Sequence, residues 1–189
     1  MNPRTSFIGK TTGILAILLL IVAIYLFTNQ KNTPEAITFE DCVSFGNPVM
    51  ESYPRQCISK EGKHFTEDIG NTLEKENFIR LSNPLPNAVI SSPLNITGSA
   101  RGNWYFEASF PIFLTDWDGK IIARGIATAD GDWMTSDFVP FKAVLTFDTS
   151  LISGQYSDRG SLILKKDNPS GLPANDDALE IPVKFIIKK

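Results

Sequence analysis

One stretch of the chain alternates apolar and polar side chains so regularly that few structures can accommodate it. Apolar residues occupy the even positions of this stretch: Trp104, Phe106, Ala108, Phe110, Ile112 and Leu114. The odd positions include Tyr105, Glu107, Ser109 and Thr115. A period of two places successive side chains on opposite faces of a β-strand. The pattern therefore predicts a strand over Trp104–Asp116, with Trp104, Phe106 and Phe110 on its buried face.

From residue 78 onward the sequence has the pattern of short strands separated by turn-forming residues. Their expected ranges are Phe78–Leu81, Asn95–Arg101, Trp104–Asp116, Lys120–Ala129, Phe138–Asp148, Ser161–Lys166 and Glu180–Ile187. Asp118-Gly119 predicts a tight hairpin and Asp130-Gly131 a second turn, because glycine adopts a positive φ without strain. Seven strands in about 110 residues predict an all-β chain built as an antiparallel β-sandwich.

Three prolines fall inside these expected strands, namely Pro111, Pro140 and Pro182. Proline has no N–H to donate to a neighbouring strand. We therefore expect the three strands to lie at sheet edges or to be interrupted by bulges.

The N-terminal part contains an uninterrupted apolar run from Gly13 to Phe27. Thr11, Thr12 and Thr28 are tolerable flanks that extend the run to about eighteen residues. At 1.5 Å per residue, a helix of that length reaches roughly 27 Å, close to the ~30 Å hydrocarbon core of a bilayer. Arg4 and Lys10 precede the run, whereas Lys31 alone follows it closely, so the positive-inside rule places the N-terminus in the cytoplasm. This predicts a cytoplasmic tail at residues 1–10 and a single-pass anchor in the cell membrane at 11–28. A cleaved signal peptide is the alternative, but no small-x-small site follows the run.

The remaining residues divide by composition into four parts on the extracytoplasmic side. Residues 29–39 are polar and predict a tether, and residues 40–68 form a compact segment that brackets two cysteines. Residues 69–77 are charged and polar and predict a linker or a helical turn. Residues 78–189 form the β-domain.

Cys42 and Cys57 are the two cysteines of the chain, and both lie on the predicted outer side. An oxidising compartment favours a disulfide between them. Zinc would lack a ligand, because His64 is the single histidine. A redox role is disfavoured because exchange enzymes separate their thiols by two residues. We expect a disulfide-stapled minidomain with no metal.

Charge and motifs exclude two further classes of function. The chain has 18 Lys and Arg against 21 Asp and Glu, with a formal net charge of −3 and no basic stripe, so a nucleic-acid partner is not expected. G-x-S-x-G is absent and His64 lies outside the β-domain, so we do not expect an enzyme or a cofactor.

A set of short motifs carries a family resemblance over about residues 78–187. The motifs are Ser92-Pro93-Leu94, Gly98-Ser99-Ala100-Arg101-Gly102-Asn103-Trp104, Phe106-Glu107-Ala108-Ser109-Phe110, Gly131-Asp132-Trp133-Met134 and Asp167-Asn168-Pro169-Ser170-Gly171. Together they resemble the bacterial spore-germination immunoglobulin-like domain. The resemblance implies an immunoglobulin-like β-sandwich at a bacterial cell surface, without a catalytic motif.

Four residues in the predicted turns are candidates for ligand binding: Trp117, Trp133, Asp118 and Asp132. Two exposed tryptophans at one end of a sandwich would form a platform for a sugar ring. Alternatively, the rings fold back over the open end of the core. The aspartates occur in two D-x-D pairs, but the EF-hand spacing for calcium is absent, and turn formation explains them.

Arg101 and Glu107 flank the aromatic strand and carry opposite charges. We expect a structural pair across the sheet, with a ligand-facing pair as the alternative. Trp104 shares the parity of the core face and is expected in the core.

Taken together, the sequence predicts a non-enzymatic, membrane-anchored module that recognises an envelope protein or polymer through loops or a sheet edge. Two alternatives stay open. One is a carbohydrate-binding module that holds peptidoglycan through Trp117 and Trp133. The other is a structural spacer without a dedicated ligand.

Overall fold

The computed structural model describes residues 19–22, 25, 35–152 and 157–186. The chain divides into two compact units, Met1–Ile37 and Thr38–Lys189. The predicted anchor at 11–28 lies outside the described residues except for 19–22 and 25. Within the described residues, no helix has both the length and the apolar character needed to cross a membrane.

The second unit begins with a small three-stranded minidomain. Helix α2 (Phe39–Ser44) is followed by the strands β1 (Val49–Met50), β2 (Gln56–Ile58) and β3 (His64–Thr66), which form one antiparallel sheet in the order β1-β2-β3. Helix α2 starts at a capping box, in which the Asp41 N–H donates to Thr38 Oγ1 and the Thr38 N–H donates to Asp41 Oδ2. Such a box satisfies N–H groups that a helix start otherwise leaves unpaired.

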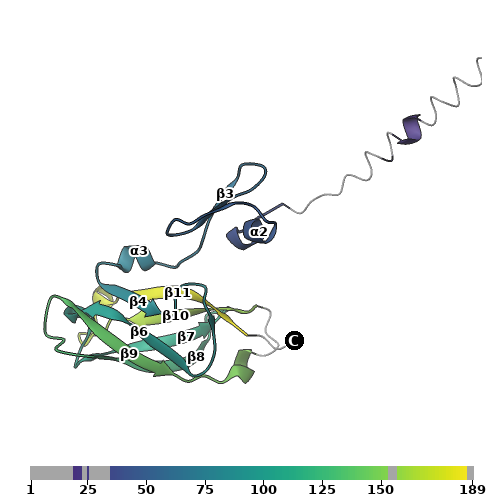
Figure 1. The fold of residues 1–189 in the computed structure, drawn as a ribbon. Helices are drawn as coiled ribbons and strands as arrows, with labels where there is room; N and C mark the ends of the chain where they lie inside the picture. The colour runs from purple at the N-terminus through teal and green to yellow at the C-terminus, as the bar shows by residue number, and fades with distance from the viewer. Residues whose placement is uncertain (1–18, 23–24, 26–34, 153–156, 187–189) are drawn as a thin grey trace, which may run out of the picture. The chain divides into compact units, whose positions relative to one another are not determined.

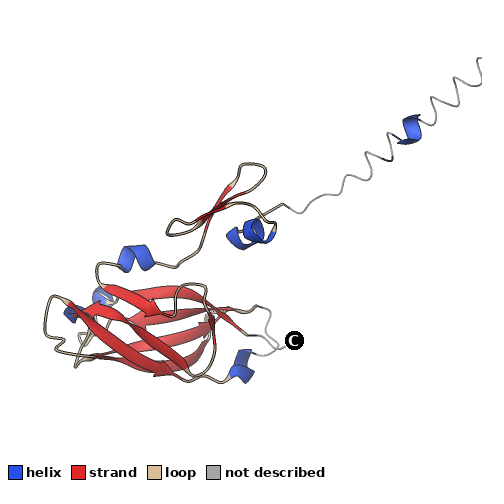
Figure 2. Ribbon diagram, viewed as in Figure 1, coloured by secondary structure: helices blue, strands red, loops and turns tan. Residues whose placement is uncertain are grey.

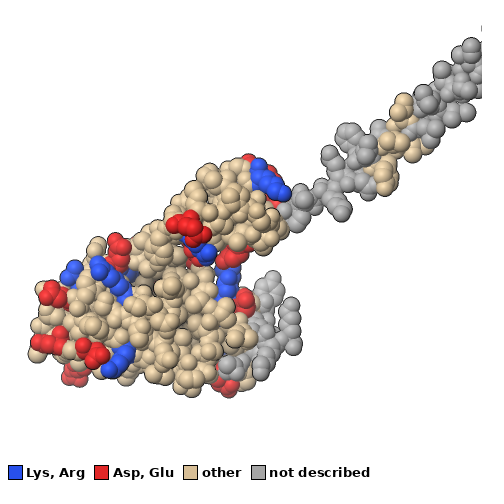
Figure 3. Space-filling view, viewed as in Figure 1, with Lys and Arg blue, Asp and Glu red and all other residues tan. Residues whose placement is uncertain are grey.

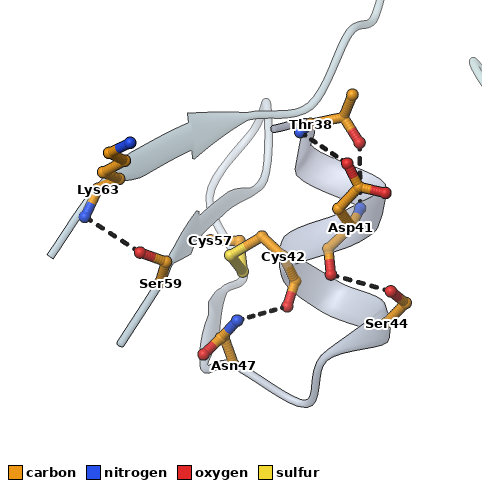
Figure 4. The surroundings of a disulfide bond; sticks show 8 residues. All are labelled: Thr38, Asp41, Cys42, Ser44, Asn47, Cys57, Ser59 and Lys63. Carbon is orange, nitrogen blue, oxygen red and sulfur yellow. Dashed lines mark hydrogen bonds between the residues drawn. A yellow bond between two sulfur atoms is a disulfide. The ribbon is translucent and has the colours of Figure 1, made fainter. Parts of the chain in front are cut away.

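A disulfide between Cys42 and Cys57 joins α2 to β2, which confirms the predicted pairing. Both cysteines are fully buried. Beside them, the Asn47 amide donates to the Cys42 carbonyl over 2.9 Å, which holds the turn after α2 (Figure 4). The bridge thus forms the centre of the minidomain.

A short connecting segment with the four-residue helix α3 (Thr72–Lys75) leads to the β-domain. The β-domain contains β4 (Ile79–Asn83), β5 (Val89–Ile90), β6 (Leu94–Arg101), β7 (Ser109–Asp116), β8 (Ile121–Ala129), β9 (Phe138–Leu145), β10 (Arg159–Lys165) and β11 (Ala178–Phe185). Hydrogen bonds link them in the order β4-β6-β9-β8-β7-β10-β11-β5. Figures 1 and 2 show the strands of this domain as arrows. Six of the seven expected strands match within a few residues at each end.

The eight strands fold into two layers that share one core. Strands β8 and β9 pair only at Thr128 with Lys142 and at Ala129 with Phe141, so this short seam joins β4-β6-β9 to β8-β7-β10-β11-β5. Inner faces of the two layers meet at the rings of Phe110 and Phe141, whose centroids lie 5.0 Å apart. The predicted antiparallel sandwich is confirmed, with eight strands in place of about seven.

The added strand is β5, and it differs from the expectation in direction as well as number. Val89 and Ile90 pair in parallel with Lys184 and Phe185 of β11, whereas all the other pairs in this sheet are antiparallel. A strand of two residues is too short to show a period in the sequence.

The strand predicted over Trp104–Asp116 is wrong in its first five residues. A 3-10 helix, η1 (Gly102–Trp104), comes first, and a tight turn from Phe106 to Ser109 precedes β7. The turn reverses the chain, so Phe106 is 41% exposed and does not share the buried face of Phe110. Trp104 is buried as expected, although from a 3-10 helix and not from a strand.

The prolines do not lie in edge strands, which corrects the expectation for Pro111, Pro140 and Pro182. Strands β7, β9 and β11 each have a neighbour on both sides. Each proline nevertheless lies where one of those two ladders has ended. The β7–β10 ladder ends at Ile112, the β8–β9 ladder covers only Phe141 and Lys142 of β9, and the β11–β5 ladder covers only Lys184 and Phe185 of β11. The missing N–H therefore costs no ladder bond.

Asparagine side chains and backbone cover the outer edge of β11 where β5 does not reach. Asn71 accepts from the Glu180 N–H and donates to the Ala178 carbonyl. Its own N–H donates to the Glu180 carbonyl, and the Asn87 N–H donates to the Pro182 carbonyl. Asn71 lies in the expected linker, and it also forms hydrogen bonds with the backbone of β11.

Candidate functional site

The four ligand-binding candidates predicted from the sequence lie at opposite ends of strand β8. Trp117 and Asp118 belong to the β7–β8 hairpin, whereas Asp132 and Trp133 follow the end of β8. Nine residues of β8 separate the two pairs, which at about 3.3 Å per residue is roughly 30 Å. The structure does not bring the two tryptophans together into one platform.

The two tryptophan rings also differ in exposure. Trp117 is 47% exposed, while Trp133 is partly buried and packs against the core. Trp133 therefore follows the alternative in which a loop ring covers the core, and a ligand-binding role for Trp117 stays a prediction.

The aspartates of the two turns hold backbone N–H groups. Asp116 Oδ1 accepts from the N–H groups of Asp118 and Lys120, and Asp132 Oδ1 accepts from the Met134 N–H. Within residues 35–152 and 157–186, no group of three His, Cys, Asp or Glu side chains is arranged to hold a metal ion. These contacts give the carboxylates a role in shaping the turns.

Arg101 and Glu107 do not form the expected pair. The Arg101 guanidinium lies over the Phe138 ring, 4.6 Å from its centroid, and donates to the carbonyls of Asn77 and Ser136. Glu107 lies in the tight turn with a φ of 49° and is exposed. Arg101 therefore has a structural role, with a ring and two carbonyls as its partners.

A hollow of about 290 Å³ lies where two segments distant in sequence meet. One segment follows β6 and the other follows β10. The lining residues are Asn103, Tyr105, Phe106, Lys166, Asp167, Asn168, Pro169, Ser170 and Asn175. A second hollow, of about 200 Å³, lies over the covered edge of β11, between Asp68, Asn71 and Pro182.

Close packing around Gly102 positions the first wall of the larger hollow. A Cβ at residue 102 would lie 2.0 Å from the Thr135 carbonyl oxygen and 2.2 Å from that of Trp133, so only glycine fits. Residue 102 starts η1, which carries Asn103. The following turn places Glu107 and Ala108 at φ values of 49° and 59°, a strained region for residues other than glycine.

Internal hydrogen bonds brace the second wall. The Asn168 amide donates to the Leu172 carbonyl and to Asp176 Oδ1, while the Ser170 hydroxyl donates to Asn168 Oδ1 and accepts from the Asn175 amide. The Asp167 N–H donates to the Trp104 carbonyl over 3.1 Å, which fastens this wall to the first. The hollow thus has a fixed backbone frame.

Charge in the hollow is mixed, because Lys166 and Asp167 both line it. Asp176 lies next to the hollow. Its pKa is held below its ordinary value mainly by the hydrogen bond from the Asn168 amide and, to a smaller extent, by the Lys165 ammonium. Asp176 is therefore ionised at neutral pH. On the face drawn in Figure 3, side chains of both signs are likewise scattered around a broad uncharged area.

Tyr105 contributes its ring to the hollow but no free hydroxyl. Its O–H donates to the Val139 carbonyl over 2.7 Å, and burial raises its pKa to about 12. The phenol therefore stays neutral at physiological pH and carries no proton to a ligand.

The two-layer antiparallel sandwich with its loop-built hollow defines an immunoglobulin-like domain. Residues 78–159, from the start of β4 to the first residue of β10, match the family model of the immunoglobulin-like domain of bacterial spore germination. The match confirms the resemblance seen in the motifs over residues 78–159, and the motif at residues 167–171 lies outside it. Comparison with curated proteins and with solved structures gives no match.

Sequence reasoning missed the hollow, although three of the motifs that carry the resemblance contribute to it. Asn103 comes from one motif, Phe106 from a second and residues 167–170 from a third, and more than sixty positions separate Phe106 from Asp167. The available signal was the polar, turn-forming sequence Asp167-Asn168-Pro169-Ser170, which indicates a loop but does not say what the loop faces.

Proposed function

We propose that this chain is a non-enzymatic binding module, held at the outer face of the cytoplasmic membrane, that recognises an envelope partner through a loop-built site. The observation that carries the binding role is the hollow lined by residues 103–106 and 166–175. In immunoglobulin-like domains the loops cluster at the two ends of the sandwich, and variable domains bind their ligands through the loops of one end. The coarser statement, that the domain is a binding or structural module, follows from the family.

Two features support the proposed location. The disulfide between Cys42 and Cys57 is a bond that persists in oxidising compartments. The apolar run of residues 13–27 and its flanking threonines at 11, 12 and 28 together come close to the length of a bilayer-spanning helix, and positive charges precede them. A membrane tether confines the binding site to two dimensions and raises its effective concentration toward partners in the envelope.

The proposal is tested with the full chain, expressed in a bacterial host with a C-terminal tag, cross-linked in intact cells and recovered from detergent-solubilised membranes. We expect at least one envelope component to be recovered in a saturable manner. A full chain carrying Gly102→Ala, which disrupts the frame of the hollow, is the control and should lose that component. Recovery of nothing above background would contradict a binding function and would favour the structural spacer.

Location is tested separately by adding protease to intact spheroplasts. We expect the Thr38–Lys189 unit to be digested from outside while the membrane stays closed. Protection of this unit, or free thiols on both cysteines in non-reducing mass spectrometry, would contradict the extracytoplasmic placement.

A further inference from the structure

We infer that the hollow between residues 103–106 and 166–175 binds one sugar ring of a glycan that bears hydroxyl and acetamido groups. This inference rests on the proposed binding function and names the ligand class and the residues that would contact it. The residues differ from the tryptophans that the sequence suggested.

Size limits the ligand to a small unit. Sites for small molecules usually enclose about 300–1,000 Å³. At about 290 Å³, the hollow lies just below that range. One ring of a glycan fits this size, with the rest of the strand continuing into solvent.

Phe106 supplies an apolar wall. Its ring is 41% exposed, because the turn at Glu107 and Ala108 directs the chain away from the core face. An aromatic ring at the edge of a polar site offers a flat surface to the C–H face of a pyranose. The exposed ring would lose contact with water when the sugar binds, which favours binding.

Polar groups in the hollow suit a ligand that both donates and accepts hydrogen bonds. Within the part of the chain that the structure describes, the side chains of Asn103, Lys166 and Asp167 make no hydrogen bond or ion pair. They offer an amide, an ammonium and a carboxylate. The Asp167 carboxylate would repel a purely anionic ligand, and the Lys166 ammonium would repel a purely cationic one. Hydroxyl and acetamido groups are neutral and can hydrogen-bond with all three side chains.

The frame is already fixed before any ligand arrives. The bonds of Asn168 to Leu172 and Asp176, and of Ser170 to Asn168 and Asn175, tie the loop after β10 to itself. A preorganised site loses less conformational entropy on binding than a mobile one. A weak ligand such as a single sugar ring needs this advantage.

The test is calorimetric titration of the full chain, in a detergent without a sugar headgroup, with the disaccharide N,N′-diacetylchitobiose. We expect saturable binding. Phe106→Ala should weaken it about tenfold, and Asp167→Asn, which keeps the side-chain shape, should weaken it several-fold. The matched control is Trp117→Ala, which removes an aromatic ring of similar exposure in another loop and should leave the affinity unchanged.

Absence of saturable heat with the unaltered chain would overturn the inference, and so would a loss on Trp117→Ala without a loss on Phe106→Ala. Unfolding midpoints of the variants provide the folding check, and Asp167→Asn keeps the test valid if Phe106→Ala unfolds the domain. Recovery of an envelope protein in the cross-linking experiment, without disaccharide binding, would refute the glycan ligand while the proposed binding function stands.

Discussion

The minidomain and the immunoglobulin-like domain of this chain are stabilised in different ways. In the minidomain, the buried centre comprises a disulfide and the neighbouring Phe39, and several large apolar side chains, such as Phe45 and Tyr53, are exposed. In the immunoglobulin-like domain, a continuous cluster of buried apolar residues from β4 to β11 fills the space between two layers. A segment of about thirty residues cannot bury enough surface to fold on apolar contacts alone, so a covalent bond compensates.

Loss of a core ring should have the largest effect, and it should be confined to the larger domain. Phe110 is fully buried between Tyr105 and Phe141. We expect Phe110→Ala to lower the free energy of unfolding by about 3–5 kcal/mol, measured by urea denaturation of the oxidised full chain. Phe106→Ala should cost under about 1 kcal/mol, because that ring is 41% exposed. Equal costs would mean that both rings lie in the core.

Removal of the disulfide should act on the minidomain alone. The bridge closes a loop with a sequence separation of 15, for which the chain-entropy model gives about 3 kcal/mol. In the double variant Cys42→Ala, Cys57→Ala we expect fast hydrogen exchange at the amides of β2 and β3, with protection retained in β10 and β11. Loss of protection in both regions would show that the two domains fold as one cooperative unit.

The capping box of α2 should contribute less. Thr38 Oγ1 accepts from the Asp41 N–H over 3.1 Å. Thr38→Ala should destabilise the minidomain by about 1 kcal/mol, measured by hydrogen exchange at the amides of α2. Thr38→Ser keeps the hydroxyl and is the control, so a similar loss in both variants would exclude the cap as the cause.

The smallest effect is expected from the ion pair between Arg55, which precedes β2, and Glu67, which follows β3. Hydrogen bonds from Arg55, at 2.9 and 2.6 Å, hold the pKa of Glu67 below its ordinary value of 4.5. A carboxylate whose pKa is lower in the folded state than in the unfolded state stabilises the fold at pH values above its unfolded pKa. This stabilisation disappears as the pH falls through the folded-state pKa.

Acidification from neutral pH should therefore destabilise the minidomain less in Glu67→Gln than in the unaltered chain. The difference should stay under about 1 kcal/mol, because the Arg55 side chain is 45% exposed. Exchange rates of β3 amides across this pH range provide the measurement, with Glu74→Gln in α3 as the control. An identical pH response in Glu67→Gln and the unaltered chain would contradict the assigned pKa direction.

Much of the fold was predictable because its causes are local. The alternation from Phe110 to Leu114 places side chains on one face of β7, and all three of its apolar even positions are buried. Asp118-Gly119 predicts the β7–β8 hairpin, and Gly119 has the expected positive φ of 78°. The disulfide followed from the number of cysteines and the predicted compartment.

The differences arise where tertiary packing overrides a local pattern. Neither Glu107 nor Ala108 is a residue type that signals a positive φ, so the alternation appeared to run through a turn that interrupts it. The hollow depends on contact between the segments after β6 and β10, and no sequence pattern records that contact. The separation of Trp117 from Trp133 follows from the length of β8, which joins the two turns that carry these rings.

The covered outer edge of β11 has a consequence for handling the protein. An uncovered strand edge presents unpaired N–H and C=O groups to which another chain can add, which promotes aggregation. Here Asn71 pairs with Ala178 and Glu180, although it precedes the first strand of the sandwich by several residues. A fragment that starts at residue 78, where the family match starts, would lose that cover and expose part of β11. Fragments for expression should therefore begin before Gly70, even when only the immunoglobulin-like domain is wanted.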